Sequence, residues 1–444
     1  MELVSALPFA PAARVASGYV RDLASSDPPV GRARARRNER LVYLASHPIP
    51  VALGELAATI GPVVRVPGIG AFVTDVEVAR EVLSNPDRFS KTGPGAVGAI
   101  LTEVMGPHAL LNMEGPDHRA LRGRLAGLFT SRFVHDLVRQ VFEPKLKETR
   151  VILEAGGELD LARLARILTG RMVCAMLGAE LPAGREDETC LDLYRTGVEL
   201  GSVATLAGRT LDPERLAFAK SRFAELTRIA KDAYERGGEE SVPGRLRSLG
   251  LSFDEARGVI GVLFLAGMET TSSALPRIAA ILMDGGHWER VNADRLLLPK
   301  AIDEGIRVTS PVPVMTRSAT EDTLLAGKKV KKDERVVVFM YDLVRSKAYG
   351  AHPREFDLDR HIGRDLAHLW FGHGPHFCLG FSLARREIEL VLETLLDAGE
   401  LEVTGRTYGR KVLFPAYESL CVRRVRGRST APDARKSKSV RVGA

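Results

Sequence analysis

The sequence predicts a single, mainly α-helical domain with small β-sheets, and three observations lead to this fold class. Apolar residues recur at helical spacing over most of the chain, whereas apolar β-branched runs are short and few. No repeat of fixed period and no long linker divides the 444 residues. A chain of this length, with 45% hydrophobic residues, is also long enough to hide a bulky cofactor in a deep interior.

The elements follow in chain order from these patterns. Two apolar runs, 63–66 and 69–74, meet at Pro67-Gly68 and predict a small hairpin. A helical period then predicts helices at 117–129, 134–155, 159–177, 213–236, 253–283 and 299–309. Strand-like pieces return at 312–316, 335–340 and 413–424. Residues 91–111 hold four glycines and two prolines, so we expect a long mobile loop that serves as a lid or binding loop.

Charge and cysteine content limit the partners and the compartment. The net charge of +7 is small against 63 basic residues, and the visible basic runs lie at 31–37 and 423–441. We interpret them as a solvated arm and a disordered tail rather than as sites for nucleic acid or acidic membranes. The expected organisation is an N-terminal extension at 1–40, one domain at 41–425 and a basic disordered tail at 426–444. Four dispersed cysteines and a start unlike a signal peptide favour the cytoplasm, without membrane insertion.

The first motif with chemical meaning is an apolar helix that ends in polar residues. Residues 259–268 are all apolar or glycine, too short a run to span a bilayer, and Ser252 and Glu255 are spaced as a capping box. Glu269 and Thr270 come directly after this run, and burying them costs free energy that is most often tolerated for function. The alternative is a helix that surfaces at this turn. Ala266 and Thr270 share one face beside Gly267, so a flat ligand could approach the backbone.

The second motif surrounds Cys378, in the stretch FGHGPHFCLG from Phe371 to Gly380. A helical pattern begins just after it, and a helix N-terminus favours the thiolate. Three interpretations are open: a zinc site with nearby histidines, a cysteine-protease nucleophile, and a single thiolate ligand of heme iron. The first lacks a second nearby cysteine, and the second leaves the acid-hydroxyl pair of the other helix unexplained.

At this point the sequence resembles the cytochrome P450 family of heme-thiolate monooxygenases. FGHGPHFCLG fits the FxxGxHxCxG signature of that family, and AGMETT from Ala266 is similar to its oxygen-activating helix motif. Glu304 and Arg307 match the ExxR pair, His118 and Arg122 match HxxxR, and Arg317 stands where the family places a propionate-binding arginine. The resemblance implies the P450 fold, a triangular prism with heme between the oxygen-activating helix and the Cys-loop helix.

The resemblance also implies a role for each matching residue. Cys378 is the expected axial ligand of heme b, iron protoporphyrin IX. The expected propionate donors are His118, Arg122, Arg317 and His376, and the other expected cofactor contacts are Phe371, Gly380, Ala266 and Gly267. Glu269 and Thr270 are the expected catalytic pair for proton delivery, which favours dioxygen over peroxide as the oxidant.

The Glu304–Arg307 pair is expected to be a buried structural ion pair. The family usually adds a third, arginine partner from a PxRF segment, but Glu355 stands at that position here. Arg354 and Arg360 are the open alternatives.

The remaining expectations concern substrate and electrons. The substrate pocket is expected to include Leu263, Ala266, Val312, Val314 and Tyr417, which suits a small apolar molecule. The chain after Gly380 is too short for a flavin domain and no cysteine set could hold an iron-sulfur cluster, so we expect a separate ferredoxin or flavodoxin-type partner with an NAD(P)H-dependent reductase. Arg385 and Arg386 are candidates for its docking face, and we expect a monomer. The alternatives are a peroxide-driven peroxygenase and a non-catalytic heme sensor.

Overall fold

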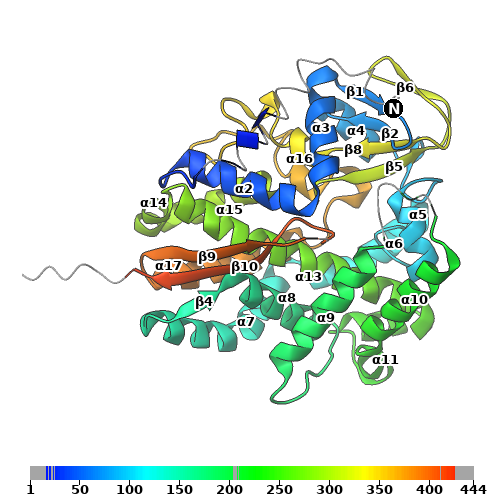
Figure 1. Ribbon diagram of the computed structural model, residues 1–444. Helices are drawn as coiled ribbons and strands as arrows, with labels where there is room; N and C mark the ends of the chain where they lie inside the picture. Colours follow the sequence, from blue (N-terminus) through cyan, green and yellow to red (C-terminus); the bar gives the residue numbers. More distant parts are fainter. Residues whose placement is uncertain are drawn as a thin grey trace, which may run out of the picture.

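The computed structural model describes residues 17–18, 20–21, 24, 26–203, 208, 210–410 and 412–425. The expected tail at 426–444 and the first sixteen residues of the expected extension lie outside the described residues. Helices dominate the described chain (Figure 1). The α-helices are α2 (Arg32–Ser46), α3 (Pro48–Ile60), α4 (Val76–Ser84), α5 (Val97–Met105), α6 (Gly115–Leu125), α7 (Ser131–Glu154), α8 (Leu161–Met176), α9 (Glu186–Gly201), α10 (Pro213–Arg228), α11 (Lys231–Arg236), α12 (Val242–Ser248), α13 (Phe253–Asp284), α14 (Trp288–Ala293), α15 (Leu298–Thr309), α16 (Met340–Leu343) and α17 (Phe381–Asp397).

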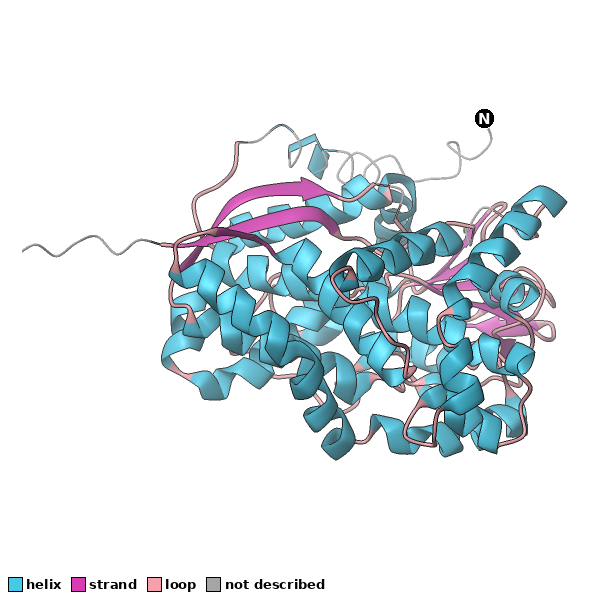
Figure 2. Ribbon diagram, turned by 90° about the horizontal axis from the view of Figure 1, so that it is seen from below, coloured by secondary structure: helices cyan, strands magenta, loops and turns pink. Residues whose placement is uncertain are grey.

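The described strands form three small sheets, and Figure 2 shows them gathered at the edges of a helical body. The largest has the order β1-β2-β8-β5-β3, in which only β2 and β8 are parallel. A second sheet has the order β4-β10-β9, and β6 and β7 form a hairpin. The strands are β1 (Val63–Val66), β2 (Gly70–Val73), β3 (Phe89–Ser90), β4 (Glu158–Asp160), β5 (Met315–Ala319), β6 (Thr323–Leu325), β7 (Lys328–Val330), β8 (Arg335–Val338), β9 (Leu401–Tyr408) and β10 (Tyr417–Arg424).

The six expected helices all exist, with shifted ends. The expected helix at 159–177 loses its first residues to β4, and the one at 213–236 is divided into α10 and α11. The expected loop at 91–111 is corrected, because its centre forms α5. Apolar residues at Ile100 and Val104 are four apart and buried, which supplies the packing that the glycine content concealed.

The arginine run at 31–37 is also corrected, since it is not an arm in solvent. It lies in α2, where Asn38 and Glu39 are buried. Asp284, at the end of α13, receives hydrogen bonds from Asn38 and from Arg406 of β9. The expected boundary at residue 40 therefore falls inside a helix that packs on α13.

Helix α13 runs through the core, and α8 packs along it (Figure 1). It begins with the expected capping box between Ser252 and Glu255. The helix is long and apolar enough to cross a membrane, but most of its apolar segment is buried inside the protein. The bent pair α2 and α3 passes the same test of length and composition.

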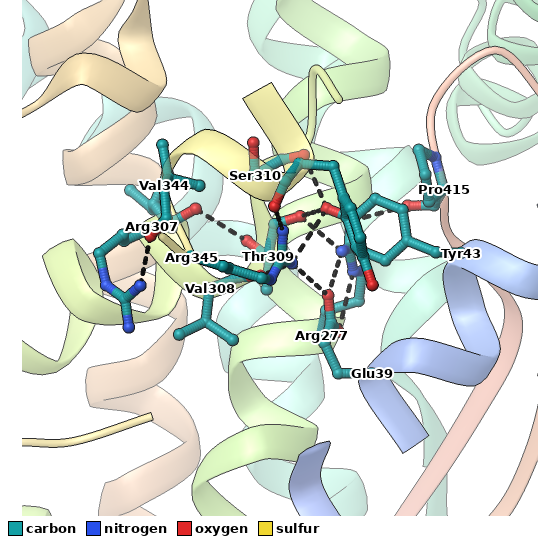
Figure 3. Close-up of polar contacts among 12 residues, drawn as sticks. Glu39, Tyr43, Arg277, Arg307, Val308, Thr309, Ser310, Val344, Arg345 and Pro415 are labelled. Atoms are coloured by element: carbon teal, nitrogen blue, oxygen red, sulfur yellow. Dashed lines mark hydrogen bonds and ion pairs between the residues drawn. The ribbon is translucent and has the colours of Figure 1, made fainter. Parts of the chain in front are cut away.

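A buried polar network fixes α2 and α15 against α13 (Figure 3). The Arg277 guanidinium of α13 donates to the Glu39 carboxylate, to the Thr309 carbonyl at the end of α15 and to the Pro415 carbonyl at 2.9 Å. Arg345 donates to the Val308 carbonyl. The two guanidinium groups thus satisfy carbonyls that the end of α15 leaves without helical partners.

Candidate active site

One stripe of the core helix α13 is accessible although the rest is enclosed. From Ala256 to Asp284 only Ala266 is exposed, while Leu263, Gly267 and Thr270 are half-buried and near it on the helix surface. The Thr270 hydroxyl donates a hydrogen bond to the Ala266 carbonyl at 2.6 Å. An exposed alanine in the middle of a core helix means that open space borders this face, as a large flat cofactor requires.

Gly267 lets a neighbouring helix pack closely on α13. A Cβ atom at this position would lie 3.1 Å from Cγ2 of Val173 in α8. The missing side chain therefore makes room for α8, and the expected cofactor contact at this residue stays a prediction.

The loop before α17 presents Cys378 among aromatic rings. Its backbone N–H donates to the Phe371 carbonyl at 3.0 Å, and the Phe371 ring packs edge-on against Phe381 with centroids 4.9 Å apart. Gly374 has a φ of 69°, and a Cβ there would lie 2.7 Å from the Leu83 carbonyl oxygen, so only glycine fits. The tight turn therefore fixes the position of the Cys378 loop next to the Phe371 and Phe381 rings.

The pKa of Cys378 differs from the expectation that the helix N-terminus favours the thiolate. Burial raises the pKa of the thiol to about 11, although the Gly380 N–H and the Arg122 charge favour the thiolate. Desolvation thus outweighs the helix terminus. A metal cation that binds such a buried sulfur displaces its proton into solvent, so a raised pKa suits a metal ligand better than a free nucleophile. No group of three or more His, Cys, Asp or Glu side chains among the described residues could hold a metal ion by itself.

Basic side chains from four segments meet beside the cysteine loop. The His118 and His376 rings stack with centroids 4.4 Å apart, and Arg122 donates to the Phe377 carbonyl. Arg317 of β5 is only 4% exposed, and burial lowers its pKa to about 10. Burial and then the charges of Lys91, His118, Arg317 and Arg122 lower the pKa of His376. The cluster is short of negative charge, so it fits a ligand with two carboxylates, such as heme.

Sequence reasoning did not single out Lys91. It lies within the Gly-rich segment, at the end of β3, and its pKa is lowered well below the usual value by burial and by Arg317. A lysine next to a short strand gives no pattern that separates it from a surface lysine. Only the fold brings it to the cluster.

Glu269 and Thr270 are neighbours in sequence but do not point the same way. Glu269 is 3% exposed, its Oε1 has no hydrogen-bond partner among the described residues, and burial raises the pKa of its carboxyl to about 8. Cβ atoms at Gly197 and Gly201 of α9 would lie 3.7 and 3.6 Å from this oxygen. The carboxyl therefore rests against the glycine face of α9 while Thr270 lies on the open stripe.

The Glu304–Arg307 pair is buried, and its third partner is Arg360. Arg307 donates to both Glu304 oxygens at 2.7 Å, and Arg360 donates to Glu304 Oε1 at 2.8 Å. Arg354 instead pairs with Asp342 at 2.8 Å.

The residues expected to line the substrate pocket lie in different places in the structure. Leu263 and Ala266 lie on the open stripe, whereas Val314 packs on the apolar cluster around Tyr43 and Phe339. Val312 is half-buried and stays a prediction. Met315, two residues before Arg317 and so on its side of β5, approaches the cysteine loop: its methyl carbon would lie 3.7 Å from a Cβ at Gly372.

Tyr417 is placed elsewhere, which corrects its assignment to the pocket. The turn of the hairpin ends before it, so Tyr417 is already in β10, and its ring packs on Tyr408 with centroids 5.7 Å apart. The charges near it include Arg406 and Asp284. Asp284 ends α13, about 27 Å along the helix from Ala266 at 1.5 Å per residue.

The two arginines considered for docking are engaged in ion pairs. Arg385 pairs with Asp303 at 2.9 Å, and Arg386 pairs with Glu389 at 2.8 Å. Both carboxylates reduce the positive field that an acidic partner would meet.

Comparison with known proteins gives consistent matches. The family model described as Cytochrome P450 matches residues 289–413. The chain is 31% identical to erythromycin C-12 hydroxylase of Saccharopolyspora erythraea, over 65% of this chain and 72% of that protein. It is 30% identical to 20-oxo-5-O-mycaminosyltylactone 23-monooxygenase of Streptomyces fradiae, over 66% of this chain and 68% of that protein. A solved mutant of P450 EryK in complex with erythromycin B superposes with a TM-score of 0.71 at 25% identity, covering 86% of this chain and 98% of that chain.

Proposed function

The chain belongs to the cytochrome P450 monooxygenases, and on that premise we propose that it binds heme b through Cys378 and inserts one oxygen atom of dioxygen into an apolar organic substrate. One observation carries this proposal: a buried cluster of basic residues, short of negative charge, borders a cysteine loop in a protein whose core helix leaves one stripe open. When bound, heme supplies the activation of dioxygen at its iron.

The proposed cofactor site divides its tasks among the named residues. Cys378 gives the thiolate, and the Gly380 N–H is placed to donate to it. His118, Arg122, Arg317 and His376 give charged or N–H donors to the propionates. Phe371 keeps water from the sulfur, and the small Ala266 side chain leaves the cofactor room at the open stripe.

Proton delivery is assigned to Thr270 and Glu269. With a pKa of about 8, the Glu269 carboxyl holds its proton at neutral pH and is able to act as an acid. The Thr270 hydroxyl now donates to the Ala266 carbonyl, and it must turn from this bond to donate toward the open stripe. This acid-hydroxyl pair supports use of dioxygen rather than peroxide.

The finer assignments concern substrate, electrons and location. Leu263, Ala266 and Met315 border the site with apolar groups, and two relatives act on erythromycin and on 20-oxo-5-O-mycaminosyltylactone, so we assign an apolar secondary metabolite as substrate. Electrons come from a ferredoxin or flavodoxin-type protein with an NAD(P)H-dependent reductase, in the cytoplasm. The proposed heme domain is the expected 41–425 with α2 added.

The test compares wild type with Cys378→Ala and, as a control, Cys174→Ala. The reduced carbonyl complex of wild type and of the control should show the strongly red-shifted Soret band of thiolate ligation, and Cys378→Ala should lose it. Persistence of that band in Cys378→Ala would disprove the ligand assignment. Product formed with NAD(P)H and redox partners, compared with product formed with peroxide, separates a monooxygenase from a peroxygenase, and no product with any substrate would favour a sensor.

A further inference from the structure

Lys91 is held at a fixed place at the base of the Gly-rich segment. Its backbone N–H donates to Glu114 Oε1 at 2.7 Å. Its carbonyl oxygen packs so closely on α5 that a Cβ at Gly98 would lie 2.2 Å from it. Contacts within the protein thus fix the backbone on both sides of the residue.

In the antiparallel pair of β3 and β5, Ser90 lies opposite Ser318, so Lys91 comes opposite Arg317 and among like charges. Arg317 and Arg122 lower its pKa, and Lys91 in turn lowers the pKa of His118 and of His376. The one acid that acts on it is Glu114. The described residues include no carboxylate in an ion pair with Lys91.

Glu114 is already engaged by other donors. Its carboxylate accepts hydrogen bonds from the Ser90 hydroxyl at 2.6 Å and from the Thr92 hydroxyl at 3.3 Å, besides the Lys91 amide. It therefore serves to shape the turn at 90–92. One carboxylate does not balance the basic residues of this cluster, and an ammonium group taken from water needs an anionic partner.

We propose that the Lys91 ammonium binds a heme propionate, as a fifth donor beside His118, Arg122, Arg317 and His376. The inference rests on the proposed function, because the propionate belongs to the cofactor assigned there. It makes the base of the Gly-rich segment, residues 91–111, part of the cofactor site.

The test measures heme loss from the loaded enzyme to a heme-accepting globin, in wild type, Lys91→Met, Lys91→Arg and the control Lys147→Met on the exposed face of α7. Losing one charge-assisted hydrogen bond should speed heme loss in Lys91→Met roughly ten- to a hundredfold. Lys91→Arg should restore most of the retention, and Lys147→Met should match wild type.

A second arm uses heme whose propionates are methyl esters. If Lys91 acts on a propionate, Lys91→Met and wild type should lose the ester at similar rates, whereas a merely destabilised fold would lose both cofactors faster. Equal loss of ordinary heme from Lys91→Met and Lys147→Met overturns the inference. So does a Lys91→Met enzyme that keeps heme but binds carboxylate substrates more weakly. A wild type without the red-shifted carbonyl band would instead refute the proposed function.

Discussion

Replacing Arg360 with Met should destabilise the protein strongly, because this guanidinium is enclosed and fully used. Arg360 is 8% exposed, and its Nε donates to Glu304 Oε1 at 2.8 Å. Its terminal nitrogens donate to the carbonyls of Tyr349, Ala351, His352 and Glu355. Methionine has a similar apolar length but no donors, so the substitution removes the hydrogen bonds while keeping most of the packing.

The magnitude follows from what is left unpaired. Removing one partner of a buried ion pair costs about 3–5 kcal/mol. Glu304 keeps Arg307 and the Asp357 N–H at 3.0 Å, so the loss should fall toward the lower end of that range. Arg290→Met is the control, since Arg290 pairs with Asp359 next to Arg360 but both side chains are largely exposed. An exposed pair contributes about 0.2–1 kcal/mol.

Urea unfolding of the heme-loaded variants, followed by circular dichroism, measures both free energies. We expect Arg360→Met to lose several times more stability than Arg290→Met. Equal losses would refute the reasoning, because they would mean that Arg307 alone satisfies Glu304 and that the carbonyls around Arg360 are hydrated without cost.

Three further predictions concern the cofactor and the proton path. Arg122→Ala and Arg317→Ala should each speed heme transfer to an acceptor globin, since each removes charge-assisted hydrogen bonds of about 1.5–3 kcal/mol; unchanged rates in both would place these arginines outside the cofactor site. Thr270→Ala should release more hydrogen peroxide per NAD(P)H consumed, and product formation should fall more than the rate of NAD(P)H consumption. A wild-type ratio of product to NAD(P)H in this variant would disprove the assigned role of Thr270. Glu269→Gln should slow turnover and change the pH dependence of stability. Because burial raises the pKa of the folded Glu269 carboxyl to about 8, its contribution to stability is full below the unfolded value of 4.5 and is lost as pH rises through about 8. In urea unfolding, the free energy of unfolding of Glu269→Gln relative to wild type should therefore rise between these two pKa values. A constant difference would contradict burial of the carboxyl.

Local patterns predicted six helices, the cysteine loop and the helix after it, because the evidence for each lies within one segment. They did not predict α2, α3, α4 or α9. The capping box and the apolar run of α13 are read from consecutive residues, and the structure confirms that helix and its cap. Helix α5 was missed because glycines and prolines on both sides concealed a short apolar face. The β6–β7 hairpin and β9 were missed as well, since their pairing depends on turns and partners that single runs do not show.

The sequence predicted which residue types form the site better than it predicted where each side chain points. The resemblance supplied His118, Arg122, Arg317 and His376, which do meet in space. It did not supply Lys91, which no motif contains. The assignment of Tyr417 to the pocket was wrong because a residue's place in the chain does not say where its side chain packs. The hairpin turns before Tyr417, which therefore lies in β10 with its ring against Tyr408.

The same limit bears on proton delivery. Consecutive helical residues project about 100° apart, so Glu269 and Thr270 cannot both face the open stripe with the helix held as it is. The Glu269 carboxyl sits against α9, where Gly197 and Gly201 leave it space and offer it no hydrogen bond. Burial raises the pKa of this carboxyl to about 8, and among the described residues no ion pair ties its side chain to α9. The proposed proton delivery would therefore require a rotation of the Glu269 side chain toward Thr270, against the packing of α9.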